Sequence, residues 1–191
     1  MPQGPAKKRN EIVSIAYKHA QKEGLSSLSI RSIAKECNIA IGTIYNYFPD
    51  KAALVTEVIS AFWSNIAFSP ETRTCLNYQK GENLITFCER LYNTMNQALG
   101  QFRSNWLGEV NSLDPRTKQK GREAENACFE HIYTSLEKVI QADSAINQSA
   151  LDAIHAQDLA YFIWNSMYNS LRREETNCSS LLSLLKLALY S

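Results

Sequence analysis

The sequence predicts an all-α protein with about nine helices. Apolar residues recur three and four positions apart through most of the chain, which is the spacing of helices that bury one face. Only seven glycines and five prolines occur among 191 residues, so we expect helices joined by short loops. Hydrophobic residues make up 45% of the chain, enough for one large core or two small ones.

The first expected helix follows a loose arm at residues 1–6 and the basic run Lys7-Lys8-Arg9. Gly24 is expected to end this helix, with Leu25 packing back beyond it. The apolar face that predicts the helix consists of Ile12, Val13, Ala16 and Ala20.

Residues 29–51 predict two short helices joined by a tight turn, followed by the start of another helix. Ser29 is a favourable N-cap, and Asn38 is one of the few residue types that tolerate a left-handed conformation at a helix end. Ile44 and Phe48 lie four positions apart and are expected to face inward. Pro49 ends the second short helix, because the residue before a proline avoids the helical region.

The second short helix leaves an uncharged, hydrogen-bonding and aromatic face outward. Two interpretations fit this arrangement. It is a helix-turn-helix, whose second helix enters the major groove of DNA, or an ordinary helical hairpin inside an all-α core.

Residues 39–54, Ile-Ala-Ile-Gly-Thr-Ile-Tyr-Asn-Tyr-Phe-Pro-Asp-Lys-Ala-Ala-Leu, are similar to the recognition-helix motif of the TetR family of transcriptional regulators. The similarity covers about a quarter of the chain, and the rest agrees only in its helical pattern. The shared features are Gly42, Thr43, Tyr45, Tyr47, Phe48, Lys51 and Leu54, with Ile30-Arg31-Ser32-Ile33-Ala34 upstream.

This resemblance implies a homodimeric, ligand-responsive DNA-binding regulator, expected to be a repressor that a small molecule releases from a palindromic operator. Its N-terminal helix-turn-helix domain would occupy residues 1–50, and a C-terminal helical domain for effector binding and dimerisation would occupy residues 51–191. The charge distribution agrees in sign, because residues 1–60 hold eight Lys/Arg against five Asp/Glu, and residues 61–191 hold twelve against fourteen. The basic run near the N-terminus either reaches the DNA backbone or is simply solvated.

The expected DNA contacts are hydrogen bonds and apolar contacts to phosphates and base edges. Asn46 is suited to adenine, Tyr45 and Tyr47 to phosphate oxygens, and Gly42 to a close backbone approach. Two residues depart from the family pattern: Ala40 stands where a hydroxyl residue is usual, and Ile41 stands where a polar or basic residue is usual. Ile41 either contacts a thymine methyl or shields the turn. The predicted DNA-binding residues are Arg31, Ile41, Gly42, Thr43, Tyr45, Asn46, Tyr47 and Lys51.

A fourth helix is expected from Lys51 to about Ala67, capped by Asp50. A lysine at its first position opposes the helix dipole unless an anion binds there, so Lys51 is either a phosphate contact or a solvated lysine. Residues 69–81 are expected to form a loop. The remaining helices are expected at residues 82–99, 102–110, 115–142, 148–173 and 179–190.

The last two expected helices are too apolar for one small domain to bury. Residues 159–164 are apolar on every side, and the final helix carries six leucines. This pattern indicates a dimer interface, and the family resemblance implies a four-helix bundle across a two-fold axis.

The resemblance also implies a ligand chamber among the C-terminal helices, although aromatic residues at helical spacing are more often plain core. An alternative is a regulator whose chamber is filled by side chains. The predicted ligand-binding residues are Trp63, Phe87, Tyr92, Met95, Trp106, Phe129, Tyr133, Asp158, Tyr161 and Asn165. Phe62, Trp164 and Gln97 are further candidates.

Several other classes of protein find no support in the sequence. The five cysteines and three histidines show no zinc-binding spacing, and no catalytic motif or cofactor-binding motif is present. An odd cysteine count, no membrane span and no signal peptide fit a cytoplasmic location. The competing function is an all-α ligand-binding or enzymatic bundle that does not bind DNA.

Overall fold

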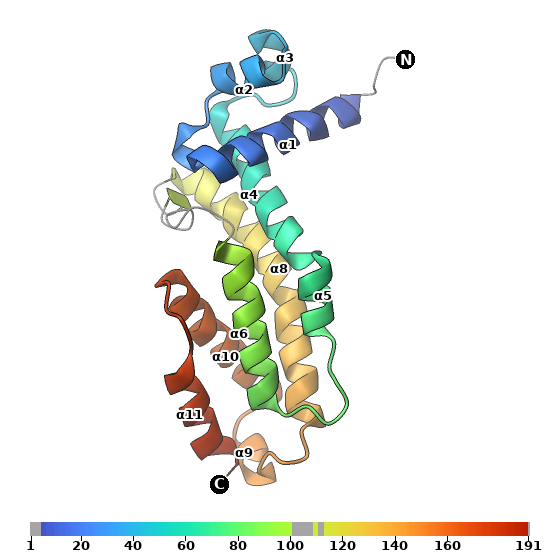
Figure 1. The fold of residues 1–191 in the computed structure, drawn as a ribbon, viewed down its shortest axis with the longest axis vertical. Coiled ribbons are helices and arrows are strands. Elements are labelled where there is room, and N and C mark those ends of the chain that lie inside the picture. The colour runs from blue at the N-terminus through green and yellow to red at the C-terminus, as the bar shows by residue number, and fades with distance from the viewer. Residues whose placement is uncertain (1–4, 101–108, 111–112, 191) are drawn as a thin grey trace. The chain divides into compact units, whose positions relative to one another are not determined.

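The computed structural model describes residues 5–100, 109–110 and 113–190, and this part of the chain is all-α (Figure 1). It contains ten α-helices and one short 3-10 helix among the described residues, which confirms the predicted fold class. The chain divides into two compact units. Unit 1 comprises residues 1–65 and 101–126, and unit 2 comprises residues 66–100 and 127–191.

Unit 1 is built on the N-terminal helices. They are α1 (Pro5–Glu23), α2 (Ile30–Glu36), α3 (Ile41–Tyr45) and most of α4 (Lys51–Ala67), together with the first part of α8 (Pro115–Ala142). The 3-10 helix Leu25–Ser27 joins α1 to α2. The buried core of this unit includes Ile12, Ala16, Ala20, Ile33, Ala34, Ile44, Phe48, Leu54, Val58 and Phe62.

The turn between α2 and α3 is held by backbone and side-chain caps. Ser29 and Ser32 form a reciprocal capping box at the start of α2. At its end, Asn38 adopts a left-handed conformation with φ 51°, and the Ile39 amide donates to the Ala34 carbonyl at 3.0 Å. The Asn38 amide donates to the Lys35 carbonyl at 3.1 Å, which completes a Schellman motif. The predicted cap at Ser29 and the left-handed Asn38 are both confirmed.

The segment 101–126 contributes to unit 1 through Glu109 and Gly121. The Glu109 carboxylate accepts the Leu25 amide at 2.6 Å and the Ser26 hydroxyl at 2.9 Å. Gly24 has φ 91°, a conformation that favours glycine, and a Cβ there would lie 2.9 Å from a Glu109 oxygen, so a side chain would also displace that carboxylate. A Cβ on Gly121 would lie 3.3 Å from Ile59 Cγ2, which shows how closely α8 approaches α4 in this unit.

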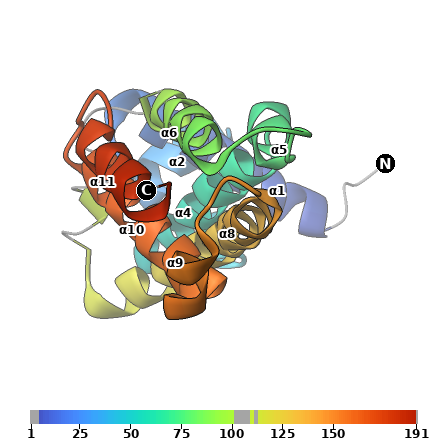
Figure 2. The ribbon, with the colours of Figure 1, turned by 90° about the horizontal axis from the view of Figure 1, so that it is seen from below.

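Unit 2 contains α5 (Pro70–Leu76), α6 (Leu84–Gly100), the remainder of α8, α9 (Gln148–Ala153), α10 (Ala156–Arg172) and α11 (Ser179–Leu189). Within this unit, α5 and α11 lie on opposite sides of α6 (Figures 1 and 2). Its buried core includes Leu84, Phe87, Cys88, Leu91, Tyr92, Met95, Ile132, Leu136, Ile163, Trp164 and Met167.

A buried carboxylate joins three parts of unit 2. Asp143, which is 8% exposed, accepts the Leu84 amide at 2.8 Å and the Ala145 amide at 3.0 Å. Its Oδ2 atom also accepts the Tyr190 hydroxyl, and the Asn147 amide donates to the Leu189 carbonyl at 2.7 Å. The start of α6, the end of α8 and the end of α11 are therefore fixed together.

Three boundaries predicted from the sequence are wrong. The first helix begins at Pro5, inside the arm expected at residues 1–6. The expected loop at 69–81 contains α5, whose start carries a Ser69 cap that accepts the Thr72 amide at 3.0 Å and a proline in the first turn. The expected helix 148–173 is broken at Ile154 and His155 into α9 and α10. Neither glycine nor proline marks this break, and α9 has no buried residue that would hold it in line with α10.

The expected short helix at 102–110 lies mostly outside the described residues. Across the described chain, no single helix is both long and apolar enough to cross a membrane; α4 and α5 together, as a strongly bent pair, meet that test of length and composition.

Candidate nucleic-acid interface and ligand-binding residues

Helix α3 presents an uncharged face to solvent, as its sequence predicts. Ile41 is 41% exposed and Tyr45 is 51% exposed, while Ile44 and Phe48 are fully buried beneath them. Gly42 and Asn46 are also exposed, and Thr43 and Tyr47 are half-buried. The buried pair anchors the helix to unit 1, so the exposed side chains are free to meet a ligand of matching shape.

Among the described residues, no contact explains the glycine at position 42. A Cβ built there meets nothing within 4 Å, and the backbone has no positive φ. Since glycine weakens a helix relative to alanine, the fold alone would favour alanine at this position. A binding requirement for a close backbone approach would account for the glycine.

The caps of α3 and α4 differ in chemistry. Ala40 occupies the N-cap of α3 and makes no side-chain cap bond, as expected from its departure from the family pattern. Asp50 caps α4 by accepting the Ala53 amide at 2.7 Å, which confirms its predicted role. Lys51 and Arg31 are both exposed, at the start of α4 and on the first turn of α2.

The basic run Lys7-Lys8-Arg9 lies in the first turns of α1 and not ahead of it as expected, and two of its three side chains form ion pairs within unit 1. Lys8 pairs with Glu11 at 3.1 Å. The Arg9 guanidinium pairs with Glu57 at 2.7 Å and lies over the Phe48 ring, 5.2 Å from its centroid. Arg9 therefore packs against Phe48, one of the two buried residues that hold α3 in place.

The predicted ligand-binding residues belong to both units, and some are buried whereas others are partly or fully exposed. Trp63 belongs to unit 1 and is buried. In unit 2, Phe87, Tyr92, Met95 and Phe129 are buried, whereas Asp158 and Tyr161 are exposed and Tyr133 and Asn165 are half-buried. Trp106 lies outside the described residues. The further candidates Phe62 and Trp164 are buried, and Gln97 is exposed.

Several aromatic rings of unit 2 contact one another. The Phe129 ring meets those of Trp164 and Tyr168 edge-on, with centroids 5.0 Å and 4.8 Å apart. Tyr133 stacks on Tyr161 at 4.5 Å. The Trp164 Nε1 atom is buried and has no hydrogen-bond partner among the described residues, which is a costly state for an N–H donor.

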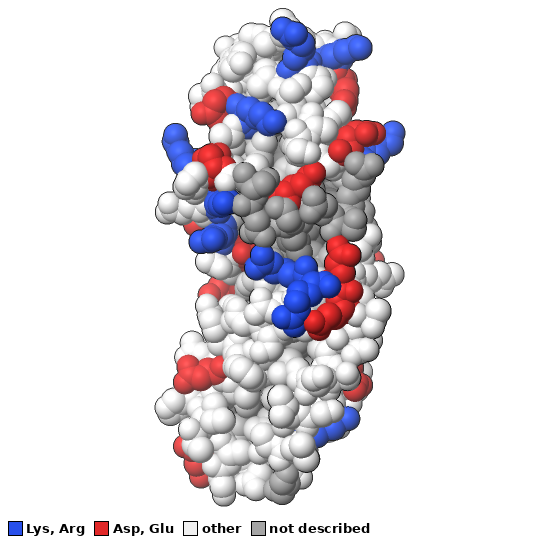
Figure 3. Space-filling model, turned by 90° about the vertical axis from the view of Figure 1, so that its left-hand side faces the viewer, with Lys and Arg blue, Asp and Glu red and all other residues white. Residues whose placement is uncertain are grey.

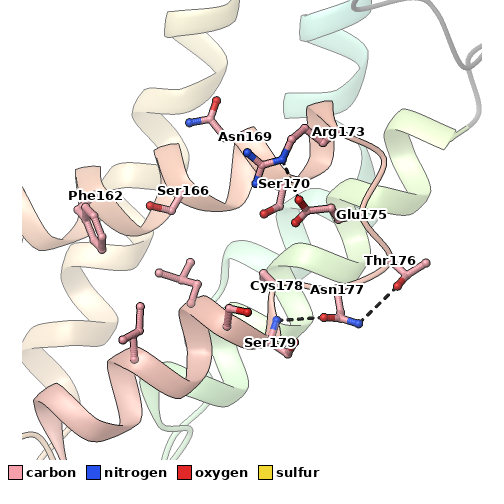
Figure 4. A pocket seen from close by; sticks show the side chains of 13 residues that line it. Phe162, Ser166, Asn169, Ser170, Arg173, Glu175, Thr176, Asn177, Cys178 and Ser179 are labelled. Carbon is pink, nitrogen blue, oxygen red and sulfur yellow. Dashed lines mark hydrogen bonds and ion pairs between the residues drawn. The ribbon is translucent and has the colours of Figure 1, made fainter.

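A pocket of about 770 Å³ opens where α10 ends and α11 begins (Figure 4). Polar groups line one end, where the Arg173 and Glu175 side chains pair at 2.7 Å and Asn177 Oδ1 accepts the Ser179 amide at 3.1 Å. Phe162 and Leu184 line the other end and are 58% and 63% exposed. None of the predicted ligand-binding residues that the structure describes lines this pocket.

The described residues include no group of three or more His, Cys, Asp or Glu side chains that could hold a metal ion. Cys75, Cys88, Cys128 and Cys178 are buried, and Cys37 is half-buried. Burial raises the pKa of the Cys88 thiol well above its ordinary value, and it raises the pKa of Cys178 to about 11. Neither thiol is therefore activated as a nucleophile.

Residues 12–58 match the sequence profile of a family described as bacterial regulatory proteins of the TetR family. Two curated relatives share this segment. The chain is 38% identical over 56 residues to YuxN, an HTH-type transcriptional regulator of Bacillus subtilis, and 43% identical over 51 residues to an HTH-type regulator of Staphylococcus aureus. These matches cover 29% and 27% of this chain, and only 19% and 28% of the relatives.

Solved structures resemble the chain over nearly its whole length. Salmonella enterica GusR superposes with a TM-score of 0.63 at 18% identity, covering 100% of this chain and 99% of GusR. Bacillus subtilis FadR in complex with stearoyl-CoA superposes with a TM-score of 0.64 at 14% identity, covering 92% and 96%. At such low identity these likenesses concern the fold alone.

Proposed function

Because the chain belongs to the TetR family of bacterial regulatory proteins, we propose that it is a DNA-binding transcriptional regulator. The observation that carries this proposal is the exposed, uncharged face of α3, which includes a glycine that the fold does not need. That family consists of regulators, so the chain is not expected to be an enzyme. Its place of action would be the cytoplasm, where the DNA lies.

In this proposal α3 enters the major groove, with α2 packed across it. Asn46 would read adenine, and Ile41 would contact a thymine methyl and favour A·T pairs. Thr43, Tyr45 and Tyr47 would donate to phosphates or base edges, Gly42 would allow close approach, and Arg31 and Lys51 would pair with phosphates. These roles are supported by the exposure of Arg31, Ile41, Tyr45, Asn46 and Lys51 and the partial exposure of Thr43 and Tyr47, close to the capped helix α2.

We further propose a homodimer that places two α3 helices in successive major grooves of a palindromic operator. The support comes from α10 and α11, which carry exposed Tyr161, Phe162, Leu184 and Leu187. The lower part of the face in Figure 3 carries few charged side chains. An exposed apolar surface of this kind is typical of a protein–protein interface, and the pocket beside Phe162 and Leu184 would lie under the partner copy.

A small-molecule effector would bind in the core of unit 2 and release the protein from DNA. The support is the unpaired Trp164 N–H, which a ligand carbonyl or carboxylate could satisfy, amid buried Phe87, Met95 and Phe129. A solved relative of similar fold, FadR, holds stearoyl-CoA. Such release is allosteric if effector and DNA prefer different states of the protein, and then each weakens the binding of the other equally.

The test begins with selection of operator sequences from random duplex DNA by the full-length protein. We expect an inverted repeat, bound with an affinity that falls steeply as salt rises. Lys51→Ala should reduce the slope of log affinity against log salt by about 1, because one phosphate contact is lost. Tyr45→Phe keeps the ring and removes the hydroxyl, and it should weaken binding about tenfold.

Lys120→Ala provides the matched control, since it removes an exposed lysine of unit 1 that lies on α8 and is not among the predicted DNA-binding residues. It should leave operator affinity unchanged. Absence of any sequence preference at every salt concentration would contradict the proposal and favour the all-α ligand-binding or enzymatic bundle. If the Ile41→Lys variant selects the same operator sequence as the wild type, Ile41 does not determine the preference for A·T pairs.

A further inference from the structure

A second pocket lies on the other side of unit 2 from α11. It is formed where α4 ends, along α5 and against the second half of α8, and its volume is about 510 Å³. That volume is within the range of small-molecule sites, roughly 300–1,000 Å³. Because α5 and α11 lie on opposite sides of α6, this pocket is separate from the proposed dimer surface (Figure 2). Of the ligand-binding residues predicted from the sequence, none within the described part of the chain lines it.

The walls of this pocket are aromatic. Phe68 is 54% exposed and Tyr78 is 38% exposed, so both rings are accessible to a ligand. The His131 ring meets Phe68 edge-on, with centroids 5.8 Å apart. Three aromatic rings around one hollow offer stacking and edge contacts to a flat ligand.

The charged groups of the pocket are cationic, and its other polar residues, Asn77, Thr134 and Ser135, are neutral. Arg73 and Lys138 line it, and none of the described residues that line it is an aspartate or a glutamate. Within the described residues, neither cation takes part in an ion pair. Arg73 instead lies over the Phe68 ring, 5.4 Å from its centroid. A guanidinium that stacks on a ring in this way keeps the N–H groups at its edge for an acceptor.

From these observations we propose that the pocket lined by Phe68, Arg73, Tyr78, His131 and Lys138 binds an aromatic carboxylate. The carboxylate would accept hydrogen bonds from Arg73 and Lys138, and its ring would lie among Phe68, Tyr78 and His131. Inorganic phosphate would meet the two cations but leave the rings uncovered, and an uncharged aromatic compound would leave the cations unpaired. Only an organic anion with a flat apolar body matches both halves of the pocket.

Naphthoate is a suitable probe, and naphthamide is its uncharged counterpart of nearly the same shape. Isothermal titration of the full-length protein, without DNA, should give saturable naphthoate binding that weakens as salt rises. Naphthamide should bind at least about tenfold more weakly, because its neutral amide has no negative charge to pair with the two cations and only one acceptor oxygen. Arg73→Gln and Lys138→Gln should each weaken naphthoate binding by a similar factor.

Both substituted side chains are exposed, so the fold should survive, and far-UV circular dichroism checks this. Lys120→Gln removes the same charge from the same helix within unit 1 and should bind naphthoate as tightly as the wild type. Equal affinity for naphthoate and naphthamide would overturn the proposal, as would naphthoate binding that neither Arg73→Gln nor Lys138→Gln affects. Since the titration contains no DNA, its outcome is independent of the proposed regulatory function.

Discussion

At the scale of single residues, Gly42 separates what the fold needs from what binding needs. Its backbone is helical and its missing Cβ would point into open space. The sequence alone could not show this, because a glycine in a short helix is equally compatible with a packing constraint.

Gly42→Ala should therefore stabilise the free protein, by up to roughly 0.5–1 kcal/mol, since alanine favours the helix over glycine. The same change should weaken operator binding, because a methyl group would stand between the backbone of α3 and the groove. Chemical denaturation measures the first effect and fluorescence anisotropy with labelled operator measures the second. Gly100→Ala, at the exposed end of α6, should not affect operator binding; unchanged affinity in Gly42→Ala would contradict the assigned role.

Tyr190 supplies a second prediction at this scale. Burial, followed by its hydrogen bond to Asp143, raises the pKa of the phenol above its ordinary value of 10.0. The unfolded chain therefore loses this proton at a lower pH than the folded protein does. The stability that Tyr190 contributes is complete below pH 10 and declines as pH rises further.

Tyr190→Phe should accordingly cost about 1 kcal/mol near neutral pH, where the hydroxyl donates to Asp143. The difference in unfolding free energy between the two proteins should then shrink as pH rises above 10. Urea denaturation of both proteins across this pH range measures the difference, and comparing the pair cancels the contributions of other titrating groups. A difference in unfolding free energy that stays constant above pH 10 would contradict a raised pKa of Tyr190 in the folded protein.

At the scale of elements, the periodicity of the sequence located the helices well and their interruptions poorly. Helices with a strong apolar face and a clear cap, such as α4 and α8, begin and end where expected. The start of α5 is predictable from the sequence, since Ser69-Pro70-Glu71 combines a capping serine, a first-turn proline and an acidic residue. The break at Ile154 and His155 is not predictable in this way, because it depends on packing that no local residue signals.

The candidate DNA-binding face was predictable from the helical spacing of apolar residues, which also predicted α2 and α3. A short helix with two inward residues four apart leaves its other positions outward, and Ile44 and Phe48 determine which those are. The ligand-binding residues could not be sorted in this way. Buried Met95 and exposed Asp158 both satisfy a helical pattern, and only the arrangement of the helices in three dimensions distinguishes a core residue from one at a surface.

At the scale of the whole molecule, DNA binding as proposed depends on pairing two copies. Leu184 and Leu187 are 63% and 71% exposed, so placing a charge there should cost a single subunit little stability. In a dimer the same charges would be buried and opposed by their symmetry mates.

Replacing both leucines with glutamate should therefore yield a folded monomer that binds a palindromic operator far more weakly than the wild type does. Light scattering coupled to size-exclusion chromatography gives the mass, and the same operator assay gives the affinity. Ile154→Glu, a comparable change at an isoleucine 44% exposed and outside α10 and α11, serves as the control and should stay dimeric. A wild-type protein that is already monomeric at every concentration would rule out this mode of assembly.

The composition of unit 1 has a consequence for engineering. Glu109 holds the Leu25 amide, and Gly121 packs on Ile59, so the unit that carries α3 includes residues far along the chain. A chimera that transplants only residues 1–65 onto a foreign sensor would leave these contacts unmade. To retarget a sensor to this protein's operator, the graft should include residues 101–126 together with the N-terminal segment.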